Sequence, residues 1–472
     1  MSNNKLYTDL VNKGNQTGEA ISIQKFLVRV QGLDKVKIGA VVVFETGEDG
    51  IVQGVQEDFV EILNLSPSLI SIGTLVVEKT DELTIGVSDD LLGRIINPLG
   101  HPIDSLGIIT KSKQQKVFNN AITFNERDVL STQMETGVTL VDTLFPIVYG
   151  QRIAIMGDAK SGKTSFLSQL SINQAKKKKI IVYVLIGKRK SDIELLIRRF
   201  EEAKIRDKVV MVIADVFDSL PLTYLAPYSG CAVAEYLWHA GNDVIVIYDD
   251  LSNHAKAYRE LSLLLRKNPG REAYPGDMFY AHSSLLERAG KTLNNGKTLT
   301  SLPISVTPND DITGFLSTTL ISITDGQLIF DNSIMRQGIK PAVNVGLSVS
   351  RVGGRGQTQT ARYLARIISS YLANYRTTLE SSRFVSDQSN ETKSTLRIGE
   401  RIYLIFGQSP KELFTLIEQQ IMLQVALGSG GIDDFDSVKL RQTVRDIALK
   451  DKVNTNIDNL SQKIIQSMQV GA

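Results

Sequence analysis

Cysteine and histidine are scarce in this sequence of 472 residues. A single cysteine, Cys231, excludes an internal disulfide framework and a thiolate-rich metal site. The spacing of the four histidines contains no HExxH pattern, so a zinc hydrolase has little support. These histidines are His101, His239, His254 and His282.

An excess of charge of one sign is also missing. Lys and Arg total 53 and Asp and Glu total 51, for a formal net charge of +2. The whole chain therefore gives no electrostatic reason to expect a nucleic-acid partner. The N-terminal segment has no apolar signal core, and no uninterrupted run of about 18 apolar residues occurs anywhere. We expect a cytoplasmic chain that reaches the inner face of a membrane only through partner subunits.

The composition that is present, 42% hydrophobic and 22% charged residues, is typical of a globular protein. At roughly 150 residues per domain, this length predicts about three folding units. We expect a short N-terminal segment at 1–19, a β-barrel domain at 20–86, an α/β domain at 87–360 and an α-helical domain at 361–472.

Short apolar runs separated by turn-rich pieces predict the barrel. These runs cover residues 23–30, 39–44, 60–65 and 74–77. No stripe of basic and aromatic residues accompanies them, which favours a packing module over a ligand-binding barrel.

The central region alternates β-branched runs with helical stretches, which predicts βαβ units around a mostly parallel sheet. The expected strands are 152–156, 180–186, 209–213, 244–247 and 320–323, and the helices between them include 163–175 and 193–203. Beyond residue 360 we expect helices at 363–379, 394–404, 410–427 and 438–468.

One segment fits the pattern GxxxxGK[ST] fully, between an expected strand and an expected helix. It consists of Gly157, Asp158, Ala159, Lys160, Ser161, Gly162, Lys163 and Thr164. In such a loop, backbone N–H groups and the helix N-terminus cradle phosphates. Lys163 is expected to reach the β and γ oxygens of ATP, or the β oxygens of ADP, and the Thr164 hydroxyl to help hold Mg²⁺.

Two acidic residues end the strand predicted at 244–247. We interpret Asp249 as the carboxylate that holds Mg²⁺ through its water shell, since charged groups at this end of a parallel strand lie beside the ligand crevice. A helix N-cap is the alternative role for Asp249, and Asp250 is the better candidate for that cap.

The strand predicted at 180–186 leads to Lys188, and no carboxylate follows until Asp192. Hydrolysis needs a group that positions the attacking water, typically Glu or Gln. A charged lysine can stabilise phosphate but cannot act as a base. The pattern therefore indicates a loop built to bind nucleotide rather than to cleave it.

Several longer motifs in the sequence are similar to those of one protein family. They are GRIINPLG at 93–100, YDDLSNHA at 248–255, LSLLLR at 261–266, PGREAYPGD at 269–277, ISITDGQ at 321–327 and NVGLSVSRVGG at 344–354. In this order they resemble the alpha subunit of F-type ATP synthases. The resemblance implies a β-barrel, a RecA-like nucleotide domain and a helical C-terminal domain.

The resemblance also implies a hetero-hexameric ring in which alpha-type and beta-type subunits alternate around a central gamma-type shaft. In that family the beta subunit carries the catalytic Glu, while alpha binds Mg-ATP without exchange and lends an arginine to its neighbour. Arg351 matches that arginine finger, and Ser348 and Ser350 would support its placement.

Other residues of this sequence match family positions that lie near the adenine or the shaft. Lys340 and Pro341 match an Arg-Pro pair near the adenine, and Gln408 falls in a Gln-Gly-Gln segment near the same base. The loop 269–277 matches the part that faces the shaft. Stalk subunits are further expected partners, and nucleic acid is not.

Several residues depart from the family pattern. Ala159 and Lys160 replace Arg and Gln, Lys188 replaces Gln, and Phe406 stands where a Gln is expected, which adds positive charge near the phosphates. The segment before the barrel is shorter than the family's stalk-docking extension, so coupling to a proton channel stays open.

Three alternatives to an ATP synthase subunit remain at this point. The first is a subunit of an F-type-like ATPase that is uncoupled from proton transport and drives another mechanical process. The second is a self-sufficient hexameric secretion or RNA-translocase ATPase, and the third is a structural ring subunit with a vestigial nucleotide site.

Overall fold

The computed structural model describes residues 2–110, 112–382, 390–429, 435–450 and 457–470. The chain divides into two compact units. Unit 1 comprises residues 1–128, 178–306 and 311–324, and unit 2 comprises residues 129–177, 307–310 and 325–472. Each unit is described by itself.

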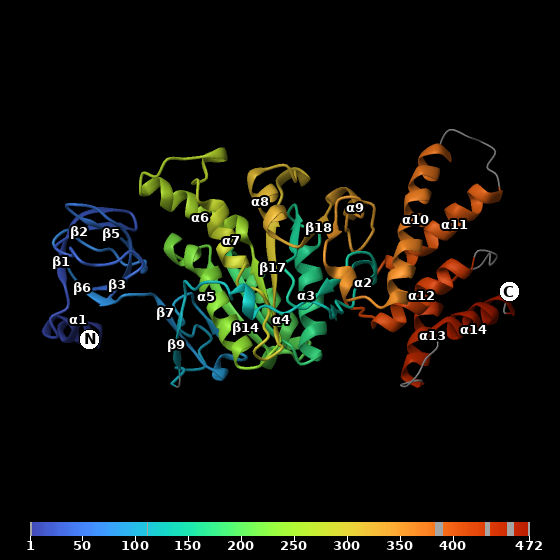
Figure 1. Ribbon diagram of the computed structural model, residues 1–472, viewed down its shortest axis with the longest axis horizontal. Helices are drawn as coiled ribbons and strands as arrows, with labels where there is room; N and C mark the ends of the chain where they lie inside the picture. Colours follow the sequence, from blue (N-terminus) through green and yellow to red (C-terminus); the bar gives the residue numbers. More distant parts are fainter. Residues whose placement is uncertain (1, 111, 383–389, 430–434, 451–456, 471–472) are drawn as a thin grey trace. The chain divides into compact units, whose positions relative to one another are not determined.

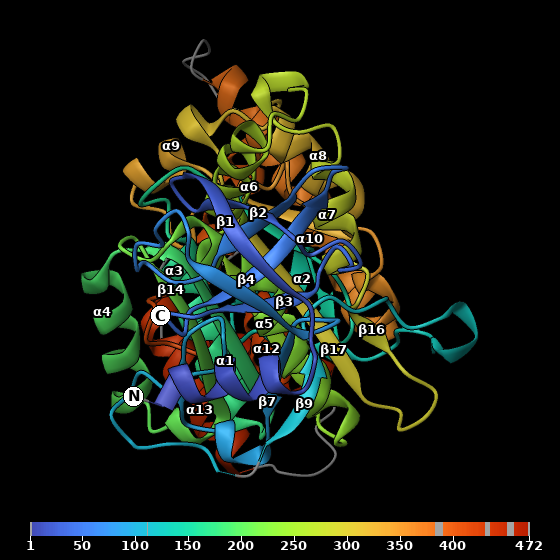
Figure 2. The ribbon, with the colours of Figure 1, turned by 90° about the vertical axis from the view of Figure 1, so that its left-hand side faces the viewer.

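Unit 1 begins with helix α1 (Ser2–Asn12) and a closed barrel of six strands (Figures 1 and 2). The strands are β1 (Thr17–Gln24), β2 (Leu27–Gln31), β3 (Val41–Phe44), β4 (Asp49–Val55), β5 (Val60–Asn64) and β6 (Leu75–Thr80), in the order β1-β2-β5-β4-β3-β6. Alternate residues such as Val28, Val30 and Val42 fill its interior. The barrel is confirmed, but the run expected at 23–30 is two strands, because the chain turns at Lys25 with a φ of 55°.

The rest of unit 1 is built around a parallel sheet. Its strands are β8 (Ile95–Ile96), β13 (Ile180–Lys188), β14 (Val209–Asp215), β15 (Val244–Asp249) and β17 (Thr298–Val306), in the order β17-β15-β13-β14-β8. The helices are α4 (Lys190–Glu202), α5 (Leu220–His239), α6 (Leu251–Leu264), α7 (Met278–Leu286) and α8 (Phe315–Ile323). Strand β16 (Gly290–Lys291) pairs with β17, and β7 (Thr84–Val87) pairs with β9 (Lys113–Lys116). The central strands are buried along nearly their whole length, as expected for a sheet covered on both faces.

Unit 2 holds five further strands and the C-terminal helices. β12 (Ala154–Gly157) pairs in parallel with β18 (Gly326–Phe330), which pairs antiparallel with β19 (Val349–Ser350). A second pair is β10 (Gln133–Met134) and β11 (Ile147–Val148), and the short helices are α2 (Thr139–Leu144) and α9 (Asn332–Arg336). The longer helices are α3 (Lys163–Lys176), α10 (Gln359–Ser382), α11 (Asn390–Phe406), α12 (Leu416–Gly428), α13 (Ser437–Lys450) and α14 (Ile457–Val470).

Three expected elements need correction. Residues 320–323 form the last turn of helix α8, and the strand begins only at Gly326, because β-branched residues have only a weak intrinsic preference for strands. The helix expected at 410–427 begins at Leu416, where Thr415 and Glu418 form a capping box. The stretch 438–468 contains two helices, α13 and α14, and residues 451–456 between them lie outside the described residues.

Within the described ranges, no helix combines the length and the apolar character that a membrane span requires.

A buried ion pair ties three segments of unit 1 together. The Arg288 guanidinium donates from Nε and Nη2 to the two carboxylate oxygens of Glu235 on α5, each at 2.7 Å. Arg288 also donates to the Val117 carbonyl at 2.9 Å, and the side chains of Arg288 and Glu235 are 1% and 4% exposed. Each charge thus depends on the other for compensation in the buried interior of the unit.

Removing one partner should destabilise the fold strongly. We expect Glu235→Ala to lower the free energy of unfolding by about 3–5 kcal/mol, because the Arg288 charge would stay buried without its partner. Urea unfolding followed by circular dichroism measures this change. The control is Lys25→Gln, which removes the exposed Lys25–Glu260 ion pair. This variant should unfold at the same urea concentration as the wild type. Equal free energies of unfolding for Glu235→Ala and the wild type would contradict the stabilising role of the Arg288–Glu235 ion pair.

Candidate functional site: a phosphate loop and an acidic pair

The phosphate loop lies in unit 2 between β12 and α3, as the sequence predicts. Gly157 and Gly162 take φ angles of 148° and 103°, a region that favours glycine. At Gly157 a Cβ would also lie 2.3 Å from the Phe330 carbonyl oxygen. Both glycines are therefore needed for the path of the loop.

The Lys163 ammonium is folded over this loop. It donates to the carbonyl oxygens of Gly157 and Asp158 at 2.6 and 2.7 Å and to Ser161 Oγ at 3.4 Å. Lys163 is 8% exposed, whereas Lys160 and Thr164 are exposed. The loop thus presents two lysines, one hydroxyl and the first N–H groups of α3, which is the donor set that phosphate oxygens require.

The 3₁₀ turn Pro308–Asp310 supports the loop from outside the motif. The Asn309 N–H donates to Asp158 Oδ2 at 3.1 Å, and the Asp158 N–H donates to Asp310 Oδ1 at 3.4 Å. Sequence reasoning missed this support, because the turn is about 150 residues away and has no motif of its own.

The predicted metal carboxylate, Asp249, lies in unit 1 at the end of β15. Lys188 Nζ is 2.5 Å from Asp249 Oδ1, and the Tyr183 hydroxyl donates to Asp249 Oδ2 at 3.1 Å. Burial and the nearby carboxylate raise the pKa of Tyr183 well above its usual value, so the phenol remains a donor. Both oxygens of Asp249, a residue only 4% exposed, are thus engaged by side chains of β13.

Asp250 has the helix-capping role that the sequence suggests. Its Oδ1 accepts the N–H of Asn253 at 2.9 Å, which caps α6, and its Oδ2 lies 3.4 Å from Lys188 Nζ. Burial raises the pKa of Asp250, and the Lys188 charge opposes this shift. Burial lowers the pKa of Lys188, but Asp249 and then Asp250 outweigh it and hold that pKa above its usual range. The three side chains form one charge cluster.

Asn253 fixes the backbone that carries Lys188. Its Nδ2 donates to the carbonyl oxygens of Ile186 and Gly187 at 2.9 and 3.2 Å. Sequence reasoning missed both Asn253 and Tyr183. A polar residue inside the otherwise aliphatic strand β13 was the available signal for Tyr183.

The residues expected near the adenine lie in unit 2. Lys340 is exposed and lines a cavity of about 960 Å³ together with Tyr375, Arg376, Tyr403 and Arg441. Pro341 follows it and is partly buried. Aromatic rings and cations of this kind suit a flat anionic ligand. A contact of Lys340 with the base stays a prediction.

Gln408 has a different environment. Its side chain is 5% exposed, accepts the N–H of Thr139 at 3.0 Å and donates to the carbonyl oxygens of Gly137 and Glu412 at 2.6 and 2.7 Å. The neighbouring Gly407 lines the cavity of Lys340. The Gln408 amide thus joins α2 to the segment before α12, and its expected contact with the base stays a prediction.

Arg351 directly follows β19 and is exposed. Its backbone N–H donates to the Asp325 carbonyl at 2.9 Å, and Ser350 Oγ donates to the Pro146 carbonyl at 2.6 Å. The buried Ser348 Oγ accepts the N–H of Ile329 at 3.0 Å. Both serines therefore anchor the strand from which Arg351 projects.

The predicted site residues thus form two groups. Unit 2 contains the phosphate loop, Ser348, Ser350, Arg351, Lys340, Pro341 and Gln408, and unit 1 contains Lys188 and Asp249. No group of three or more His, Cys, Asp or Glu side chains suited to a metal occurs in the described ranges. The Thr164 hydroxyl is exposed, whereas each Asp249 oxygen accepts from a side chain of β13, and the expected contacts of both residues with magnesium stay predictions.

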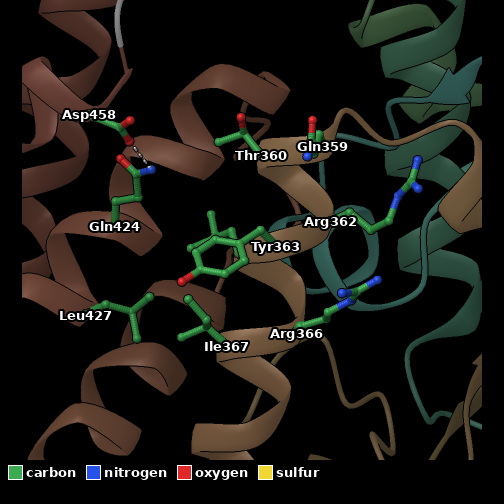
Figure 3. Close-up of a pocket in the computed structure, with 10 residues that line it drawn as sticks. Gln359, Thr360, Arg362, Tyr363, Arg366, Ile367, Gln424, Leu427 and Asp458 are labelled. Carbon is green, nitrogen blue, oxygen red and sulfur yellow. Dashed lines mark hydrogen bonds between the residues drawn. The ribbon is translucent and has the colours of Figure 1, made fainter.

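Another cavity, of about 850 Å³, lies among α10, α12 and α14. Figure 3 shows Tyr363 at its centre, and Gln424 donates to Asp458 at 2.8 Å on the facing helices. It contains none of the predicted site residues, so we assign it no nucleotide chemistry.

A β-barrel, a phosphate loop in an α/β fold and a C-terminal group of helices together define the class of multidomain P-loop nucleotide-binding proteins. Residues 137–350 match the ATP synthase alpha/beta family, nucleotide-binding domain, and residues 357–471 match the ATP synthase alpha/beta chain, C-terminal domain. The chain belongs to the ATP synthase alpha/beta family, and its similarity is to the alpha subunits.

Three relatives, each named ATP synthase subunit alpha, carry that similarity. The one from Caldanaerobacter subterraneus subsp. tengcongensis is 38% identical over 91% of this chain and 85% of its own length. The one from Neorickettsia sennetsu is 38% identical over 89% of this chain and 85% of its own length. The one from Petrotoga mobilis is 39% identical over 90% of this chain and 86% of its own length.

The contacts of Gln408 predict a mainly structural effect of its removal. We expect Gln408→Ala to lower the free energy of unfolding by about 1–3 kcal/mol, because it leaves buried backbone groups without partners. Thermal unfolding measures this loss, and Ser409→Ala, a change at the exposed neighbour, is the control. Weaker ATP binding with unchanged stability would instead place the amide at the base.

Proposed function

We propose that this chain is an alpha-type subunit of a rotary F-type ATPase that binds an adenine nucleotide and does not itself catalyse hydrolysis. The single observation that carries the proposal is Lys188, which ends β13 and lies 2.5 Å from Asp249. An ammonium held by two carboxylates cannot accept a proton from water, so this strand end supplies no general base.

Binding is assigned to the phosphate loop. Its glycine geometry, the N-terminus of the 14-residue helix α3 and the side chains of Lys160, Lys163 and Thr164 offer donors to phosphate oxygens. The family relationship supports ATP or ADP as the nucleotide.

Arg351 is assigned to the catalytic site of a beta-type neighbour. It is exposed at the end of an anchored strand, where a guanidinium can reach beyond its own chain and stabilise charge on a transferring phosphoryl group. On this proposal the chain alternates with beta-type subunits in a hetero-hexamer around a gamma-type shaft. It lies in the cytoplasm and meets a membrane only through partner subunits.

A self-sufficient hexameric ATPase is disfavoured by the same strand end. Such an enzyme would need a water-positioning carboxylate where this chain has Lys188, and Arg189 and Lys190 follow it.

The isolated chain tests the nucleotide assignment. We expect calorimetry to detect ATP binding, and phosphate-release assays to show turnover far slower than that of a complex with a beta-type partner. Lys163→Ala should abolish binding, because it removes the buried ammonium of the loop. Robust turnover by the purified chain alone would refute the non-catalytic assignment.

The finger role is tested in the assembled complex. Arg351→Ala should lower turnover by about 10³- to 10⁵-fold, because a finger acts on transition-state charge, while ATP stays bound to this chain. Arg355→Ala is the matched control, since Arg355 is also exposed and lies four residues further along. Undiminished turnover of the Arg351→Ala complex would exclude the role.

A further inference from the structure

Unit 2 contains a long stretch of chain without acidic residues. Residues 332–379 include seven Lys and Arg residues and no Asp or Glu, although the whole chain has a net charge of only +2. Each of these seven basic residues is exposed. The stretch therefore has no counter-charge of its own, and its positive potential extends into the solvent.

Two of these cations, Arg362 and Arg366, share one side of α10. They are four residues apart on the helix, and Figure 3 shows both guanidinium groups extending to the same side. Arg362 donates to the Gln357 carbonyl at 3.1 Å. Within the part of the chain that the structure describes, Arg366 has neither a hydrogen-bond partner nor an ion-pair partner. Its guanidinium can therefore bind a carboxylate of another chain, in the bidentate manner typical of arginine.

Both arginines line the cavity of about 850 Å³ among α10, α12 and α14. The apolar part of its lining includes Leu364, which is 4% exposed, and the half-buried Ile367 and Leu427. Tyr363 also lines the cavity and is 66% exposed. Arginine and tyrosine side chains beside apolar groups are typical of protein-binding surfaces.

The facing wall of the cavity is already satisfied in its polar contacts. Gln424 donates to Asp458 at 2.8 Å and accepts from the Ser461 hydroxyl at 2.8 Å. Asp458, the acidic residue among the described lining residues, is thus bound to the wall. The polar groups left for an incoming molecule are chiefly the guanidinium groups, which favour an anionic occupant.

The lining favours an acidic protein segment over a phosphate polyanion. An oligonucleotide could stack a base on Tyr363, but its backbone would leave the aliphatic side chains in contact with water. A peptide brings Asp or Glu to the arginines and apolar neighbours to Leu364, Ile367 and Leu427. The volume of the cavity also far exceeds what a single phosphate group requires.

We propose that Arg362 and Arg366, together with the cavity that they line, bind an acidic segment of the beta-type neighbour. The inference rests on the proposed assembly and assigns one contact surface of it. Arg351, which is assigned to the catalytic site of a beta-type neighbour, belongs to the same acid-free stretch of unit 2. Arg366 contributes to association and takes no part in phosphoryl transfer.

Photo-cross-linking in the assembled complex identifies the occupant. The photoreactive amino acid p-benzoylphenylalanine replaces Tyr363, the complex with the beta-type partner is irradiated, and mass spectrometry identifies the cross-linked peptides. We expect a peptide of the beta-type partner that contains Asp or Glu. The same probe in place of Val438, which is 72% exposed and does not line the cavity, should not capture that peptide.

A charge reversal measures the contribution of the arginine. Arg366→Glu should weaken association with the beta-type partner about tenfold, because it turns an attraction into a repulsion. Calorimetric titration at two salt concentrations should also show a smaller salt dependence for this variant than for the wild type. Arg366→Lys keeps the charge and should lose less affinity. Lys463→Glu, a reversal on α14 outside the cavity, should match the wild type.

The outcomes separate this surface from the proposed function. Failure of the wild-type chain to associate with a beta-type partner would refute the proposed function itself. Normal association would overturn the docking surface alone if Arg366→Glu kept the wild-type affinity, or if the probe at position 363 captured only RNA, only this chain or nothing. Because the cross-link is made with both arginines intact, it decides the question even if Arg366→Glu fails to fold.

Discussion

The parallel pairing of β13 and β15 is the constraint on which the acidic site depends. In this register Leu185 lies opposite Asp249, so the three residues that extend β13 further bring Lys188 alongside the two carboxylates. Because the carboxyl ends of parallel strands meet at one edge of a sheet, the polar groups gather there without any local motif. The buried aliphatic residues of both strands hold this register, since a slip would expose them.

The two lysine substitutions, Lys160 and Lys188, add positive charge, and their effects are complementary. The first adds a cation to the phosphate loop of unit 2, while the second balances two buried carboxylates of unit 1. Neutralising the acidic pair with a lysine also removes any base from the end of β13. One residue therefore balances the charge of the acidic pair and also leaves an ammonium, rather than a carboxylate, at the end of β13.

The sequence predicted the barrel, the phosphate loop and the helical C-terminal domain, because turn spacing, a complete motif and helical periodicity are all local signals. Residues 320–323 were assigned to the wrong element, since a short apolar run such as Leu320–Ile323 fits a strand or a buried helix equally well. The partners of Lys188 and Gln408 were beyond sequence reasoning. Each depends on residues more than 60 positions away and on side-chain directions that only the packed fold determines.

The shared strand β18 has a mechanical consequence. Its carboxyl end packs Phe330 against Gly157 of the phosphate loop, and its amino end pairs Gly326 with Ser350, next to Arg351. These ends are four residues apart, which is about 13 Å along an extended strand. A strand of this length with hydrogen bonds to both neighbours is stiff, so it holds the phosphate loop and the backbone of Arg351 at a fixed separation.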